Sequence, residues 1–203
     1  MIIAIVGKAQ HGKDTLGKML ADTLFEKSGI KYVLMAYATE LKKRVQKDFD
    51  MSYEQLWGGG KEIPDHRYKK PMRSESDNEP CWTPREILQE YGQFFRTIDY
   101  DFWVKALFAI IDDKEYENVI ITDARHPNEA EPVKKHGGII VRIIRNVKTG
   151  VHNQQHISET AMDNYKVDYD IRNFGDLDDL QKTADQLADV ILNTKKEIKI
   201  IGG

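Results

Sequence analysis

Residues 2–15 read "IIAIVGKAQHGKDT", and this stretch decides the fold. Ile2–Val6 is a short, β-branched, apolar run, which is typical of a strand buried on both faces of a parallel sheet. Gly7, Gly12 and Lys13 then satisfy the G-x-x-x-x-G-K spacing of a phosphate-binding loop. Apolar residues at helical spacing follow. The sequence therefore predicts a strand, a phosphate loop and a helix that begins near Lys13.

The loop chemistry is unusual at one position. Glycines let the backbone N–H groups converge on phosphate oxygens beside the positive end of a helix, and Lys13 supplies charge for the β- and γ-phosphates. Asp14 stands where a serine or threonine normally binds Mg²⁺; its carboxylate can offer an oxygen, with the Thr15 hydroxyl one residue later. Alternatively, Asp14 only stabilises the helix N-terminus. The predicted nucleotide-binding residues are Gly7, Lys8, His11, Gly12, Lys13, Asp14 and Thr15, and Mg²⁺ is assigned to Asp14 and Thr15.

The rest of the chain alternates between strands and helices. Further strands are predicted at 31–38, 118–124, 138–145 and 167–173, and further helices at 39–49, 83–98, 99–112, 128–137 and from 177 onward. This alternation indicates one α/β domain with a five-stranded parallel sheet and helices on both faces. Two polar stretches interrupt it, and such long irregular segments are commonly functional. We predict a substrate-side insertion at 51–82 and a lid-like segment at 146–165.

Composition limits the partners. The 203 residues include 33 acidic and 30 basic side chains, so a net charge of −3 creates no overall attraction to nucleic acid or anionic membranes. Neither a signal peptide nor a membrane span is expected, and the single cysteine, Cys81, suits a reducing compartment. We expect a cytoplasmic protein (in the host cytoplasm if it is viral) with small-molecule substrates, no nucleic-acid partner and no membrane; homodimerisation remains open.

A phosphate donor site implies an acceptor site. Phosphoryl transfer requires a second anion site and a carboxylate near the metal. Asp123 ends a predicted strand, where ligands of open α/β sheets gather, Arg125 follows two residues later, and Glu129 lies one helical turn further on. The alternative for Asp123 is a simple helix cap. The predicted catalytic residues are Lys13, Asp123, Arg125 and Arg145.

Other candidates lie at the ends of elements. Arg85 lies in the first turn of a predicted helix, and Arg67 in the basic part of 51–82. Arg142 and Arg145 flank the end of a strand before the lid-like segment, as expected for arginines of a closing lid. For each arginine, a surface ion pair is the alternative. Trp103 would either stack on a base or belong to the core.

Four ordered pieces of the chain resemble the bacteriophage deoxynucleoside monophosphate kinase family. They are "GKAQHGKDT", "TPREILQEYGQFFRTIDYDFWVKALF", "VIITDARHPNEAE" with "GGIIVRIIR", and "HISETAMDN" with "DYDIRNFGDLDDL". Residues 50–80 do not align clearly. The resemblance implies a P-loop kinase fold and transfer of the ATP γ-phosphate to a deoxynucleoside monophosphate with Mg²⁺.

The resemblance also implies site residues. It assigns the ATP phosphates to Gly12, Lys13, Asp14 and Thr15. It assigns the acceptor to Lys42, Arg67, Arg85, Gly92, Gln93, Trp103, Asp123, Arg125 and Glu129. Where the family often reads "LGT", this chain reads "YGQ", so Gln93 replaces a hydroxyl and would alter base preference. His156, in the lid-like segment, is expected to be structural or to neighbour a phosphate, because the acceptor phosphate is already an anionic nucleophile.

Two alternatives remain open at this point. One is a kinase for another small metabolite, similar to dephospho-coenzyme A kinase, which would not select among nucleobases. The other is a nucleotide-binding regulator or ATPase, which would hydrolyse ATP without an acceptor site.

Overall fold

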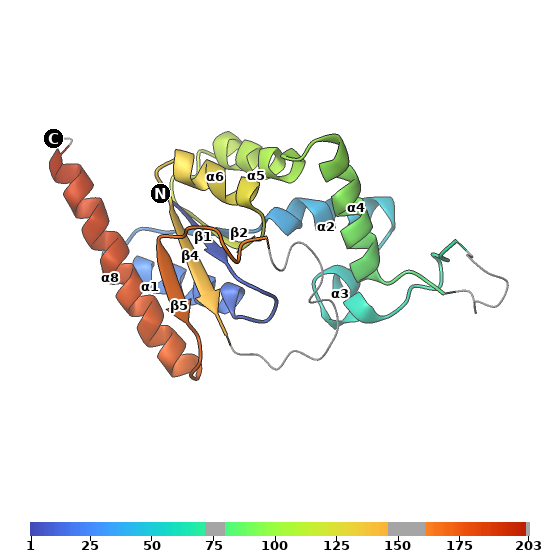
Figure 1. Cartoon of the computed structure of the whole chain (residues 1–203), viewed down its shortest axis with the longest axis horizontal. Coiled ribbons are helices and arrows are strands. Elements are labelled where there is room, and N and C mark those ends of the chain that lie inside the picture. Colours follow the sequence, from blue (N-terminus) through green and yellow to red (C-terminus); the bar gives the residue numbers. More distant parts are fainter. Residues whose placement is uncertain (72–79, 146–160, 202–203) are drawn as a thin grey trace. The chain divides into compact units, whose positions relative to one another are not determined.

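The computed structural model describes residues 1–71, 80–145 and 161–201 (Figure 1). The chain divides into two compact units. The first unit comprises Met1–Ala36 and Phe108–Gly203, and the second unit comprises Tyr37–Leu107. The second unit is therefore inserted into the chain of the first.

The first unit is built on a five-stranded sheet, and every strand pair in it is parallel. The strand order is β2-β3-β1-β4-β5. The strands are β1 (Ile2–Val6), β2 (Val33–Met35), β3 (Val119–Ala124), β4 (Ile139–Ile144) and β5 (Tyr169–Arg172). The predicted α/β fold with five parallel strands is confirmed. Only β2 is much shorter than the predicted strand at 31–38, because Tyr37 already begins a helix.

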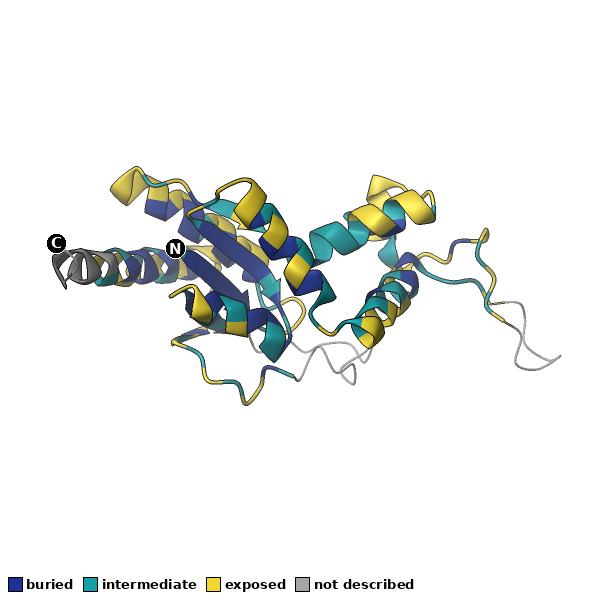
Figure 2. Ribbon diagram, turned by 90° about the horizontal axis from the view of Figure 1, so that it is seen from above, coloured by how far each residue is buried: buried dark blue, intermediate teal, exposed yellow. Residues whose placement is uncertain are grey.

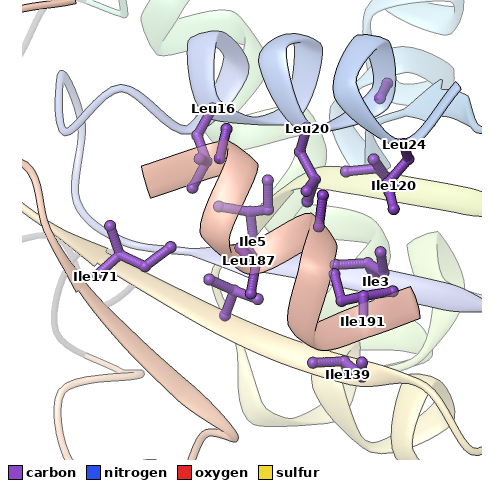
Figure 3. Packing of buried hydrophobic residues seen from close by; sticks show 14 of the residues in the cluster. Ile3, Ile5, Leu16, Leu20, Leu24, Ile120, Ile139, Ile171, Leu187 and Ile191 are labelled. Carbon is purple, nitrogen blue, oxygen red and sulfur yellow. The ribbon is translucent and has the colours of Figure 1, made fainter. Parts of the chain in front are cut away.

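Helices α1 (Lys13–Ser28) and α8 (Leu177–Ile201) cover one face of this sheet. Figure 3 shows side chains from both helices gathered around Ile3 and Ile5 of β1; they include Leu16, Leu20, Leu24, Leu187 and Ile191, all of them buried. The helical spacing of these residues explains why each helix forms against the sheet. None of the helices that the structure describes is long and apolar enough to cross a membrane.

The opposite face is also covered. Successive strand side chains point to opposite faces, so the buried Ala4 and Val6 face away from α1 and α8. Helix α6 (Pro127–Lys135), with buried Ala130 and Val133, contacts β1 and β4. The end of α5 (Phe102–Asp113) adds Phe108, whose ring centroid lies 5.1 Å from that of His136. Burial on both faces explains the apolar runs of the strands, drawn in dark blue in Figure 2.

The second unit has its own core, formed by Val45, Met51, Leu56 and Ile87. Its elements are α2 (Tyr37–Asp48), α3 (Tyr53–Leu56), the 3₁₀ helix η1 (Gly59–Glu62), α4 (Pro84–Ile98) and the beginning of α5. The predicted start of α4 is confirmed, since the Thr83 side chain accepts a hydrogen bond from the Glu86 backbone N–H and Pro84 occupies the first turn. The segment at 51–82, which was predicted to be irregular, contains α3, η1 and a Lys69–Cys81 bridge.

The first core predicts a stability effect. Leu20 on α1 is fully buried, so Leu20→Ala is expected to lower the free energy of unfolding by about 2–5 kcal/mol. Far-UV circular dichroism during urea unfolding measures this loss. The matched change Lys18→Ala, at an exposed position of the same helix, is expected to stay within about 0.5 kcal/mol of the wild type. Equal effects of the two changes would contradict the packing described for α1.

Candidate active site

The predicted phosphate loop joins β1 to α1, and its two glycines are required by its geometry. Gly7 has φ 152°, and a Cβ there would lie 2.5 Å from the backbone oxygen of Ile143. Gly12 has φ 95° and is the N-cap of α1, so it offers no side chain to the first helical turn. A glycine-rich loop that leads into the N-terminus of a helix in this way is the arrangement that binds phosphate.

The loop lysine lies inside this curve. Lys13 is buried, with 8% of its surface exposed, and its Nζ donates a hydrogen bond of 2.7 Å to the backbone oxygen of Lys8. A buried ammonium held across the loop adds positive charge to the same place as the helix N-terminus. The Asp14 and Thr15 side chains are exposed in the first turn of α1. Their assignment to Mg²⁺ stays a prediction.

The last two strands of the sheet hold the tip of the loop. His11 Nδ1 lies 3.1 Å from the backbone oxygen of Ile143 in β4. Asn173, directly after β5, is buried, and its side-chain amide donates a 2.9 Å hydrogen bond to the backbone oxygen of His11. Lys8 forms a half-exposed ion pair with Asp163, with 3.1 Å between Nζ and Oδ2. The loop is therefore fixed from outside its own sequence.

The end of β3 lies next to the end of β1 in the sheet. Ala4 pairs with Ile121 and Val6 pairs with Ala124, so β3 has one extra residue in the interval that contains Asp123. Such a bulge redirects the neighbouring side chains and is frequent beside active sites. Asp123 and Arg125 are partly buried at this edge.

Glu129 fixes the backbone that follows. This residue is only 2% exposed, and its Oε2 accepts hydrogen bonds from the backbone N–H groups of Arg125 (2.6 Å) and His126 (3.1 Å). Glu129 thereby closes the N-terminus of α6. The structure thus gives this predicted substrate residue a clear structural contact, while its contact with a substrate stays a prediction.

The phosphate loop and the end of β3 lie where the strand order reverses: the chain continues from β1 toward one edge of the sheet and from β3 toward the other edge. The helix after β1 covers one face of the sheet, and the helix after β3 covers the other. Adjacent strands whose connections run to opposite faces mark the place at the carboxyl edge where open α/β sheets bind ligands. Gly7–Thr15 and Asp123–Arg125 therefore share one edge of the first unit.

Arg67, in the second unit, has a defined partner there. Its guanidinium donates to both carboxylate oxygens of the buried Asp65, with 2.8 Å between Nη2 and Oδ2. This hydrogen-bonded guanidinium holds the pKa of the Asp65 carboxyl far below its usual range. Arg67 also lines a pocket of about 450 Å³ together with Ser52, Gln55, Ile63, Asp65 and His66. The predicted substrate role of Arg67 is untested by these contacts.

The Asp65–Arg67 pair predicts a pH dependence of stability. Because the pKa of Asp65 is lower in the folded protein than in the unfolded chain, the pair stabilises the fold above about pH 4 and loses this effect as the pH falls further. Asp65→Asn is expected to lower the free energy of unfolding by about 2 kcal/mol at pH 7. Its stability should also depend less on pH between about pH 5 and pH 2.

Tryptophan fluorescence during urea unfolding measures this effect, because Trp57, Trp82 and Trp103 all belong to the second unit. Asp50→Asn is the matched control: the Asp50 carboxylate is 3.6 Å from Arg67 Nη1 and fully exposed. Its removal is expected to change the stability by less than about 0.5 kcal/mol. Equal losses in both variants would refute the role given to the buried carboxylate.

Two further predicted acceptor residues of this unit make local contacts. Arg85, in the first turn of α4, donates a hydrogen bond from Nε to the exposed carboxylate of Glu62. Lys42 Nζ lies 5.6 Å from the centroid of the Trp57 ring. An exposed ion pair is worth little, so Arg85 can exchange Glu62 for another anion at low cost.

The remaining predicted acceptor residues of this unit lie on α4 and α5. Trp103 is 2% exposed, and its indole N–H donates a 3.1 Å hydrogen bond to the backbone oxygen of Gly92. It packs against Tyr91, Phe95 and Phe102. Trp103 therefore lies in the apolar core of this unit, which was the alternative to the predicted stacking on a base. Gln93 is exposed on α4, and the predicted acceptor contacts of these residues stay predictions.

The lid-like segment is only partly described. Residues 146–160, which include His156, lie outside the described residues. Arg145 is exposed after the end of β4. Arg142, by contrast, donates hydrogen bonds to the backbone oxygens of Met162 (3.1 Å) and Tyr165, so it holds the chain that returns to β5. The domain division with an insertion at 51–82 and a lid at 146–165 stays a prediction.

Sequence reasoning missed Asn173. This asparagine was assigned to the last predicted strand, and the signal that points to it is its place at the carboxyl end of that strand. Asp163 was also not predicted as the partner of Lys8, because 155 residues separate the two in the sequence. Among the described residues, no group of three or more His, Cys, Asp and Glu side chains is arranged to hold a metal ion.

Comparison with known proteins identifies relatives. The family model "Deoxynucleotide monophosphate kinase" matches residues 58–184, more than half of the chain. The "Putative deoxynucleotide monophosphate kinase" of Acanthamoeba polyphaga mimivirus is 27% identical over 163 residues, covering 71% of this chain and 74% of the relative. The "Uncharacterized protein ORF77" of Ictalurid herpesvirus 1 is 36% identical over 93 residues, covering 43% and 41%.

Among solved structures, shikimate kinase from Aquifex aeolicus aligns over 100% of both chains with 17% identity and a TM-score of 0.46. The family match agrees with the site: it includes the end of β3 with Asp123 and Arg125, and the asparagine that holds the phosphate loop. The resemblance predicted from the sequence is confirmed, and the chain belongs to the deoxynucleotide monophosphate kinase family.

Proposed function

We propose that this kinase transfers the γ-phosphate of ATP to a deoxynucleoside monophosphate, with Mg²⁺, and releases ADP and the deoxynucleoside diphosphate. The observation that carries the proposal is the shared sheet edge of the phosphate loop and the β3 end. It offers a donor site with Lys13 and, on the neighbouring strand, a carboxylate and an arginine. A hydrolase would need only the donor site, whereas transfer to a phosphate acceptor also requires a second anion-binding group, for which Arg125 is the proposed residue.

The donor side follows from the loop. Backbone N–H groups at the start of α1 and the buried Lys13 ammonium would bind the β- and γ-phosphates of ATP. Gly7, Lys8, His11 and Gly12 shape the loop around them. Lys13 is worth most in the transition state, when charge accumulates on the transferred group and the bridging oxygen.

The acceptor side would begin at Arg125. A guanidinium binds a phosphate through two parallel hydrogen bonds, and Glu129 fixes the backbone from which this side chain extends. An oxygen of the acceptor phosphate attacks the γ-phosphorus, and the bond from that phosphorus to the β–γ bridging oxygen breaks. The acceptor oxygen is already anionic, so no general base is required. The acceptor roles that the resemblance predicts stay proposals for Lys42, Arg67, Arg85, Gly92, Gln93 and Trp103. Arg145 keeps the catalytic role predicted from its place before the lid-like segment.

The residues present are compatible with a magnesium ion. The exposed carboxylate of Asp14 and hydroxyl of Thr15 in the first turn of α1, together with Asp123 near the end of β3, offer the oxygen ligands that Mg²⁺ prefers. When bound with ATP, the ion neutralises phosphate charge. This chain would contribute one or two of those oxygens, and water and phosphate the others.

A kinase of another small metabolite is the nearest rival, and selectivity separates the two. The experiment supplies Mg·ATP with each deoxynucleoside and ribonucleoside monophosphate singly and measures ADP together with the diphosphate product. We expect ADP only with some deoxynucleotides, in equal amount to the diphosphate. ADP release that ignores the acceptor would indicate an ATPase. No ADP with any nucleotide would overturn the proposed substrate in favour of another metabolite.

A further inference from the structure

The structure points to Asn173 as a positioning residue of the phosphate loop, an inference that rests on the proposed ATP site. Asn173 directly follows β5 and is 5% exposed. Its backbone N–H donates to the backbone oxygen of Ile144 at 2.8 Å, which holds the residue against β4. Its side-chain amide is thereby aimed at the phosphate loop, which lies 162 residues earlier in the chain.

The contact acts on one peptide unit. Asn173 Nδ2 donates to the His11 backbone oxygen at 2.9 Å. In a trans peptide the C=O of one residue and the N–H of the next point in opposite directions, and the described chain has no cis peptide bond. Holding the His11 carbonyl toward Asn173 therefore directs the Gly12 N–H to the opposite side. Asn173 thus sets the direction of a donor that the loop presents to phosphate.

A second observation links Asn173 to Gly12. A Cβ on Gly12 would lie 2.9 Å from Asn173 Nδ2, so the amide occupies the space that any side chain at position 12 would need. Gly12 also adopts φ 95°, a conformation that a free loop would hold only part of the time. Asn173 and the His11 ring, which contacts β4 through the Ile143 oxygen, fix this conformation before a nucleotide arrives. Such preorganisation strengthens binding without touching the ligand.

The test compares Asn173→Ala and Asn173→Asp with the wild type. Aspartate keeps the size of the side chain and removes the N–H donor, so it tests the hydrogen bond itself. Phe174→Ala is the matched control, because Phe174 is the next residue and is exposed. Isothermal titration with ADP gives the nucleotide Kd, steady-state kinetics give KM for ATP and for the best deoxynucleoside monophosphate, and thermal unfolding reports on the fold.

We expect Asn173→Ala to raise the ADP Kd and the KM for ATP about tenfold. Asn173→Asp should do so at least as strongly, because it places a carboxylate opposite the His11 carbonyl. The KM for the acceptor should change less than about twofold, and Phe174→Ala should bind ADP like the wild type. A residue that only supports the fold is not expected to raise the KM for ATP while leaving the KM for the acceptor nearly unchanged.

Three results would overturn the inference. Wild-type ADP affinity in Asn173→Asp would show that the donor is not needed. An equal loss for ATP and acceptor, with a lower unfolding temperature, would reduce Asn173 to a stabilising residue. Failure of the wild-type protein itself to bind ADP would overturn the proposed function, and this inference with it.

Discussion

Lys13→Met is expected to lower the rate of ADP formation by about 10²–10³-fold at saturating ATP and acceptor. Lys13 Nζ spans the phosphate loop to the Lys8 backbone oxygen, so its charge is already in place before ATP binds. Methionine keeps the length and apolar stem of the side chain and removes the ammonium. Because the ammonium stabilises charge that grows in the transition state, turnover should fall far more than ATP affinity.

Single-turnover ADP formation measures the rate of the chemical step, and thermal unfolding measures whether the variant stays folded. The lost hydrogen bond to the Lys8 oxygen should cost only about 1 kcal/mol of stability, so the variant should remain folded at 25 °C. Lys18→Met, at an exposed position five residues further along α1, should keep wild-type turnover. Near-normal turnover of a folded Lys13→Met protein would remove the lysine from the mechanism.

Arg125→Ala is expected to raise the KM for the acceptor monophosphate by about 30-fold or more, the equivalent of about 2 kcal/mol. The KM for ATP should change little. Glu129 contacts the backbone N–H of Arg125, so the substitution leaves that bond in place and tests only the guanidinium. The measurement is initial rate against acceptor concentration at saturating Mg·ATP.

Lys135→Ala is the matched control, because it removes an exposed positive charge from the other end of α6. It should leave both KM values within about twofold of the wild type, since a distant exposed charge is screened by salt. If Arg125→Ala instead raised only the KM for ATP, Arg125 would belong to the donor site, and the proposed orientation of the two substrates would be reversed.

Most of the fold could be predicted from short stretches of the sequence. The β1–loop–α1 unit was predictable because its glycines, lysine and apolar run act within fifteen residues. The start of α4 was predictable because Thr83 and Pro84 form the cap themselves. The strand at 31–38 was overextended, because an apolar run of that length does not separate a strand from the first turn of a helix.

The site was less predictable where it depends on tertiary contacts. Arg67 carries a recognisable charge, but its bidentate bond to Asp65 depends on how the 51–82 segment folds. Asn173 reads as an ordinary strand residue until β5 is placed beside β4. Glu129 was predicted from its place one helical turn after Arg125 and from the resemblance, whereas its buried contacts with backbone N–H groups follow from the α6 start beside β3. Pairings across the sheet have no local signature in one sequence.

The insertion of Tyr37–Leu107 between β2 and β3 has a consequence for how this kinase can change over time. In the part of the chain that the structure describes, β1, β4 and β5, which carry and support the phosphate loop, pair only with one another and with β3. The inserted unit has a separate apolar core. Mutations can therefore accumulate within the insert while the loop and its supports keep their register. The predicted acceptor residues Lys42, Arg67 and Arg85 lie in this insert, so under the proposed function we expect acceptor preference to change more readily than the phosphoryl-transfer step.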